Sequence, residues 1–214
     1  MNTNLAIQHA LGAVLFLTSS CCGLNSQAYA QDSPAVPPKP EESSEAKKLE
    51  AKTAAGFKEF QERVDAYVKL HKSVAGSLPN IKPTTEAEKI TDHQRELAQK
   101  IREARPHARR GEIFTENARD AFRRLIGAEF QGPHGRKART TIRQGEPLTK
   151  VHLQVNQSYP DGVPFTTLPP SLLLKFPKLP EQVAYRIVVH DLVLIDVEAN
   201  LVVDRIPEII PNNF

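Results

Sequence analysis

The stretch that decides the fold is YRIVVHDLVLIDVEANLVVDRI, residues 185–206. It is rich in β-branched residues, and two short polar interruptions, at 190–191 and 198–200, divide its apolar runs. Such residues pack well on a pleated surface, and connections this short join antiparallel neighbours. We therefore expect three strands, at 184–189, 192–197 and 201–206, that form an antiparallel meander.

This meander needs other elements to cover it. Under strict alternation Tyr185 and Ile187 share one face and Val188 lies on the other, so neither face is purely polar. Two or three isolated strands are only marginally stable in water. We expect one face to rest on helices or on the leucine-rich turn near 171–174. Asn200 tolerates left-handed backbone and suits the second connection.

Three amphipathic helices are expected before the meander, because apolar residues recur there at three- and four-residue spacing. They span about 45–73, 85–105 and 115–127. Thr85 and Glu88 match a capping box, Thr115 can cap the third helix, and Gly127 suits its end. Gly56 weakens the first helix by about 1 kcal/mol relative to alanine. The expected inward residues of the second helix are Ile90, Leu97, Ile101 and Ala104.

Residues 150–183 add further signals. Val151, Leu153 and Val155 alternate with polar residues, which predicts a half-buried strand. The sequence 159–162, YPDG, predicts a turn, and the proline pair at 169–170 predicts a short helical turn through residue 174. The fold class is therefore α+β: about three helices and then a small antiparallel sheet, in a single domain at 43–214 whose β part spans about 150–206.

The first thirty residues have the features of a signal peptide. The run LGAVLFL (11–17) is long enough for the apolar region of a signal and too short to cross a bilayer. The sequence AYA (28–30) predicts cleavage after Ala30. A lipoprotein at Cys21 is the alternative, although Thr18 stands where that signal needs an aliphatic residue. We expect a periplasmic or secreted protein with no transmembrane segment after cleavage.

The proline-rich residues 31–42, QDSPAVPPKPEE, have little to bury and predict a disordered tether. Cys21 and Cys22 are the only cysteines, and both precede the expected cleavage site. The mature protein would therefore contain no disulfide.

The middle of the chain is basic. Residues 102–143 contain eleven Lys or Arg and five Asp or Glu, whereas residues 144–214 contain five and eight. Guanidinium groups bind phosphate and carboxylate, so an anionic lipid or polymer of the cell envelope is the expected partner. Export and the lack of interleaved aromatic residues argue against nucleic acid. A charged run is also often no more than solvated surface. The candidate binding residues are Arg109, Arg110, Arg119, Arg123, Arg124, Arg136, Lys137 and Arg139.

No pattern predicts catalysis, a metal site or a cofactor. The histidines that follow the signal are scattered singly, and no nucleophile elbow or phosphate-binding glycine loop is present. One alternative is a periplasmic hydrolase that uses Asp191, Asp196 and His190. For Asp196 and Asp204 we instead expect structural roles opposite basic partners such as Arg186 or Arg205, with the Asp191 side chain bonding the backbone of a turn.

Another alternative is an oligomeric scaffold. The apolar stripe of the first helix has near-heptad spacing and could pair with a second copy. The stripe is short, and packing within its own domain is the simpler expectation. Its members are Phe57, Phe60, Val64, Tyr67 and His71.

Three phrases of the sequence carry a resemblance. They are GEIFTENARDAFRRLI (111–126), residues 159–210, and more loosely LHKSVAGSLPNIKPT (70–84). In these the chain resembles a group of exported bacterial proteins. The resemblance implies a shared fold and export but no activity or site residues. The sequence thus predicts a non-enzymatic, envelope-associated protein and leaves its oligomeric state open.

Overall fold

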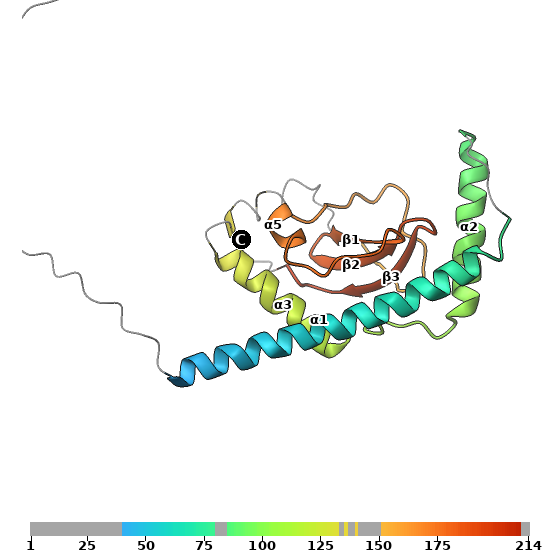
Figure 1. Cartoon of the computed structure of the whole chain (residues 1–214). Helices are drawn as coiled ribbons and strands as arrows, with labels where there is room; N and C mark the ends of the chain where they lie inside the picture. Colours follow the sequence, from blue (N-terminus) through green and yellow to red (C-terminus); the bar gives the residue numbers. More distant parts are fainter. Residues whose placement is uncertain (1–39, 80–84, 133–134, 137–139, 141–150, 211–214) are drawn as a thin grey trace, which may run out of the picture. The chain divides into compact units, whose positions relative to one another are not determined.

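The computed structural model describes residues 40–79, 85–132, 135–136, 140 and 151–210. These residues belong to one compact unit, Pro38–Phe214. The expected signal peptide and residues 31–39 of the expected tether lie outside the described residues. The architecture is α+β, as predicted: helices α1, α2, α3 and the short α5 precede a three-stranded sheet (Figure 1).

The sheet is the predicted antiparallel meander, in the order β1-β2-β3. Its strands are β1 (Val183–Val188), β2 (Asp191–Asp196) and β3 (Leu201–Ile206). The first two begin and end one residue earlier than predicted. Val189 has a φ of 57° and lies in the turn after β1, and Asn200 has a φ of 47°, the left-handed conformation expected of it.

The pairing of β2 with β3 contains one extra residue. Leu194 pairs with Asp204 and Ile195 with Val202, which leaves Val203 between them without a partner. A bulge of this kind shifts the alternation of side chains by one residue. Asp204 therefore shares a face with Leu194, whereas strict alternation would place it on the opposite face.

Helix α1 (Pro40–Ala75) carries the predicted stripe. Phe60, Val64, Tyr67 and His71 are buried in the chain's own core. The face that would pair with a second copy in a scaffold is thus already covered. The helix begins inside the expected tether, so residues 40–42 are helical; proline is tolerated in a first turn because its missing N–H has no partner there.

Gly56 allows α1 to approach α3 (Glu116–Gln131) closely. A Cβ atom on Gly56 would lie 2.5 Å from the carbonyl oxygen of Asn117 and 3.0 Å from the Cβ of Ala121. The first distance is shorter than real Cβ contacts, and the second is tighter than most of them. The glycine that looks like a weak point in the sequence is therefore a packing position.

Helix α3 has the predicted cap and a different end. Thr115 Oγ1 accepts a hydrogen bond from the Ala118 N–H at 3.4 Å. The helix continues past Gly127 to Gln131, so the predicted end is wrong. The extra turn buries Phe130, and the space around Gly127 holds no atom that a side chain would meet.

Helix α2 (Ala87–Ala104) buries side chains fully only in its second half. Leu97, Ala98 and Ile101 are buried, whereas Ile90 and Ala104 of the predicted inward face are exposed. The predicted capping box does not form, because Glu86 is the N-cap residue and makes no side-chain cap bond. Within the described residues, no helix combines the length and apolar character that crossing a membrane requires.

The strand predicted around Leu153 is not part of a ladder. Leu153 is buried between exposed neighbours, as the alternation indicates, but the backbone is irregular. Three hydrogen bonds hold the following residues to the β3 edge, including Tyr159 N–H to the Asn200 carbonyl at 2.8 Å. The turn at 161–162 is present, with Gly162 at a φ of 72°, and α5 (Pro170–Leu173) is the predicted helical turn.

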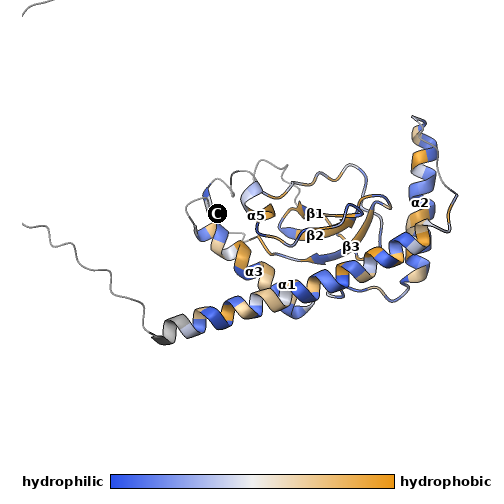
Figure 2. Ribbon diagram, in the orientation of Figure 1, coloured by the Kyte–Doolittle hydropathy of each residue, from blue (hydrophilic) through white to orange (hydrophobic). Residues whose placement is uncertain are grey.

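Two clusters of buried side chains cover the two faces of the sheet. The larger joins residues such as Leu194 and Tyr185 to Phe60 of α1 and Phe122 of α3. The smaller combines strand residues of the other face with Leu153 and Tyr159, among others. Figure 2 shows the apolar colouring of the strands beside the mixed colouring of α1. The sheet is therefore covered by helices on one face and by residues 151–163 on the other.

Candidate functional site

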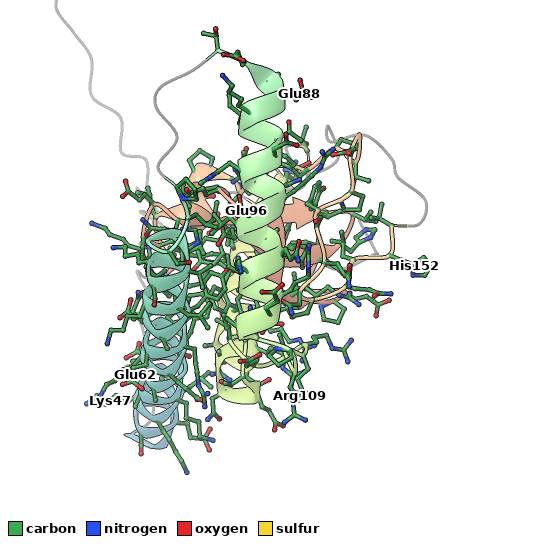
Figure 3. The ribbon with its side chains drawn as sticks, turned by 90° about the vertical axis from the view of Figure 1, so that its right-hand side faces the viewer. Lys47, Glu62, Glu88, Glu96, Arg109 and His152 are labelled. Carbon is green, nitrogen blue, oxygen red and sulfur yellow. The ribbon has the colours of Figure 1, made fainter. Side chains whose placement is uncertain are left out.

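The loop between α2 and α3 carries two of the predicted binding residues, Arg109 and Arg110. Both are exposed, and neither forms an ion pair with any described residue. In Figure 3, Arg109 lies beyond the C-terminal end of α2, on the outside of the ribbon. Two neighbouring guanidinium groups are thus available to an anion from solvent.

An open hollow of about 430 Å³ adjoins these arginines. The hollow is also lined by residues 153–155, which belong to the segment over the second face of the sheet, and by Arg205 of β3. Arg205 is already neutralised, because its Nη1 lies 2.6 Å from Asp191 Oδ2. The free positive charge at the hollow therefore comes from Arg109 and Arg110.

Asp204 fixes the shape of this loop. Its carboxylate accepts hydrogen bonds from the backbone N–H groups of Gly111, Ile113 and Phe114, at 2.8 to 3.2 Å. Gly111 has a φ of 87°, which glycine adopts readily. A carboxylate on the sheet thus organises the backbone directly after the two arginines.

Burial raises the pKa of the Asp204 carboxyl group. Hydrogen bonds from backbone N–H groups, including that of Arg205, lower this pKa in part, and the resulting pKa lies above the ordinary value of an aspartate. Within the described residues, the carboxyl group accepts all its hydrogen bonds from backbone N–H groups. The ionised form therefore fits this loop, since it accepts hydrogen bonds and donates none.

Arg105 anchors the start of the same loop. Its Nη2 lies 3.0 Å from Glu112 Oε2, and its guanidinium stacks over the Tyr67 ring at 5.0 Å. Asn156 also donates a hydrogen bond to the Arg105 carbonyl at 2.9 Å. The loop is therefore held at both ends, by Arg105 and by the contacts with Asp204.

The arginines of α3 have unequal surroundings. Arg123 is exposed, Arg119 is half-buried, and Arg124 donates to Thr53 Oγ1 of α1 at 3.0 Å. Arg136 is exposed, and Lys137 and Arg139 lie outside the described residues. Arg119, Arg123 and Arg124 thus lie on α3, a different element from the loop of Arg109 and Arg110, and no hydrogen bond or ion pair joins the two groups within the described residues.

The two aspartates of the hydrolase alternative do not come together, although His190 directly precedes Asp191 in the chain. Asp191 and Asp196 lie at opposite ends of β2, about 16 Å apart at a rise of ~3.3 Å per residue. Asp196 is fully buried. Asp191 pairs with Arg205 and accepts a hydrogen bond from the Glu208 N–H at 3.0 Å. The expectation that Arg186 or Arg205 pairs with Asp196 and Asp204 is wrong, because Arg205 pairs with Asp191 and Arg186 donates to the Tyr185 carbonyl.

Asp196 is the centre of a buried polar network between the sheet and α1. Its Oδ2 accepts hydrogen bonds from the Tyr67 hydroxyl and from His71 Nδ1, each at 2.6 Å. Its Oδ1 accepts from the Glu198 and Ala199 N–H groups. His71 Nε2 lies 3.0 Å from Glu198 Oε2. Every oxygen of this buried carboxylate is satisfied, which indicates a structural role.

The surroundings of His71 favour its protonated form. Burial lowers its pKa, but hydrogen bonds and charge from Asp196 and then Glu198 outweigh that effect, so the net pKa lies above the ordinary histidine value. Burial and the neighbouring Asp196 raise the pKa of Tyr67, which therefore stays a hydroxyl donor. The imidazolium then donates to one carboxylate from each ring nitrogen.

The sequence interpretation did not pair these residues. His71 occupies a stripe position, and Asp196 interrupts an apolar strand, so each puts a polar group where burial is expected. Because buried polar groups require partners, this coincidence is the signal that points to the pairing. Within the described residues no three histidine, cysteine or carboxylate side chains are arranged to hold a metal ion.

No protein-family model, curated protein or solved structure matches this chain. Any function assigned to this chain therefore depends on the geometry of its own residues.

Proposed function

We propose that the chain is an exported, envelope-associated binding protein without catalytic activity, and that Arg109 and Arg110 contact its anionic partner. The observation that supports this most directly is the pair of exposed, unneutralised guanidinium groups on a loop anchored by Asp204. The most prominent carboxylates and the buried histidine, in contrast, are occupied by structural contacts within the described residues.

The anchored loop favours binding in two ways. Guanidinium groups form paired, charge-assisted hydrogen bonds with phosphate and carboxylate groups. A loop already held by Asp204 and by the Arg105–Glu112 pair loses little conformational freedom when a partner binds. Phosphate or carboxylate groups of an envelope lipid or polymer have the chemistry that this surface recognises. Arg123 and Arg136 are exposed and extend the set of candidates.

Binding to vesicles tests the proposal. We compare vesicles of phosphatidylglycerol and phosphatidylcholine with vesicles of phosphatidylcholine alone, and use polyphosphate as a lipid-free polyanion. At about 1 kcal/mol per arginine near an anionic surface, Arg109→Ala with Arg110→Ala should weaken binding to the anionic probes about 30-fold. The matched control is Lys47→Ala with Lys48→Ala, which removes the same charge from exposed positions of α1.

The outcomes separate clearly. Weakening by the arginine pair alone supports the proposal, and the probe that shows it distinguishes a membrane surface from a polymer. Equal weakening by both double variants would mean that only net charge matters and would contradict it. Export is tested by intact mass: protein from the envelope fraction should begin at Gln31, and a chain with Met1 in the soluble cell contents would contradict export.

A further inference from the structure

A second hollow, of about 570 Å³, lies along the outer edge of β1, beneath the residues that follow α5. Its volume is typical of small-molecule pockets. Its lining is predominantly apolar and includes four side chains of the main core, Leu168, Phe176, Val183 and Tyr185. The hollow is therefore an opening into the core rather than a depression in a polar surface.

Two leucines border this hollow and face solvent. Leu173 is 56% exposed and Leu174 is 87% exposed, the highest values among the large apolar side chains of the described residues. Adjacent exposed leucines beside an apolar hollow are unfavourable in water unless an apolar ligand covers them. Nothing within the described residues does so.

The edge of β1 supplies a free backbone donor. Ile187 exchanges two hydrogen bonds of 2.8 Å with Thr166, on the side away from β2. Because hydrogen-bonding direction alternates along an antiparallel strand, Tyr185 also turns its N–H and C=O groups away from β2. The Tyr185 carbonyl accepts from its neighbour Arg186, at 2.9 Å from Nη1, whereas its N–H has no partner within the described residues.

Two cations lie beside the same hollow. Lys178 is exposed and forms no ion pair with a described residue. The half-buried Arg186 also lines the hollow, and its guanidinium lies over the Phe165 ring at 4.7 Å. The site thus combines apolar walls with two positive charges and one free N–H donor. A carboxylate accepts hydrogen bonds without donating any, which matches this set of donors.

An added peptide strand fits less well. Strand addition at Tyr185 would need its N–H and C=O together, and Arg186 already occupies the carbonyl. Thr166 occupies the next position of the same type, at Ile187. A ligand whose head accepts hydrogen bonds and whose length is apolar can bind here without displacing these contacts.

We propose that this hollow binds a single fatty-acyl carboxylate, its chain against Leu173 and Leu174 and its head at Lys178, Arg186 and the Tyr185 N–H. This site is separate from Arg109 and Arg110, and its existence does not depend on the function proposed above.

Titration calorimetry with hexadecanoate, kept below its aggregation concentration, tests the site on the full mature chain. One ligand should bind per chain, and both Lys178→Glu and Leu174→Asp should weaken binding tenfold or more, because each alters an exposed position next to the ligand. Lys69→Glu is the charge-matched control on α1, and Arg109→Ala with Arg110→Ala should leave binding unchanged.

Hexadecanol separates recognition of the head from burial of the chain, and it should bind at least tenfold more weakly than hexadecanoate. Absence of saturable hexadecanoate binding would overturn the proposal. So would equal weakening by Lys69→Glu and Lys178→Glu, or equal affinity for the alcohol and the acid. Both surface variants alter exposed side chains, so circular dichroism should show unchanged folding.

Discussion

At the scale of single residues, the carboxylates of three aspartates of the sheet have different kinds of partner. Asp191 uses an arginine, Asp196 a tyrosine and a histidine, and Asp204 backbone N–H groups. Only Asp204 organises a segment that carries exposed arginines. The same hydrogen bonds of Asp204 therefore stabilise the fold and hold the loop that carries the arginines.

Asp204→Asn should lower the free energy of unfolding by about 2–3 kcal/mol, because an amide N–H₂ group would face backbone donors and leave them unpaired. Urea denaturation measures this. Asp161→Asn is the control, since Asp161 is exposed in a turn and should change stability by less than about 0.5 kcal/mol. Equal effects of the two variants would show that the contacts of Asp204 contribute nothing.

The proton on His71 gives a pH dependence with a defined sign. Since the folded-state pKa is raised, its contribution to stability is fully present below about pH 6.5, the ordinary histidine pKa. The contribution is lost as pH rises through the folded-state pKa. The stability difference between wild type and His71→Gln should therefore shrink from pH 6 to pH 9 in urea denaturation.

His190→Gln is the control for this measurement, because the His190 side chain makes no hydrogen bond or ion pair with the described residues. Its difference from wild type should stay nearly constant over the same range. If the stability difference between wild type and His71→Gln grew with pH, it would contradict a protonated imidazole that donates hydrogen bonds to two carboxylates.

At the scale of elements, we expect opposite effects on stability when two helical glycines are replaced by alanine. Gly→Ala in a helix interior ordinarily stabilises by about 1 kcal/mol. Gly127→Ala should follow this rule, since nothing lies near its new Cβ atom. Gly56→Ala should instead destabilise, because that atom would lie 2.5 Å from the Asn117 carbonyl oxygen. Thermal unfolding of both variants measures the contrast, and stabilisation by both would mean that α1 and α3 do not pack this closely.

The elements also show what the sequence can predict. The α1 stripe and the three strands followed from periodicity, because burial of one face imposes it. The end of α3 could not be predicted from periodicity, because Phe130 continues the buried face beyond a glycine that could have ended the helix. The face of the sheet on which Asp204 lies could not be predicted either, because the bulge at Val203 shifts an alternation that looks regular in the sequence.

At the scale of the whole described unit, the site depends on contacts between distant segments. The basic composition of residues 102–143 could be read from the sequence, but the anchoring of its loop by Asp204 joins residues about ninety positions apart. Local patterns carry no information on such a contact. The second hollow likewise arises where the segment after α5 meets the β1 edge.

Amide chemical-shift mapping during a titration with polyphosphate tests the central claim most directly, because this probe has anionic groups and no acyl chain. Binding through the anchored arginines predicts saturable shifts at residues 108–114 and at 153–155, which border the same hollow. Unchanged signals there, with saturable shifts confined to other parts of the chain, would contradict it.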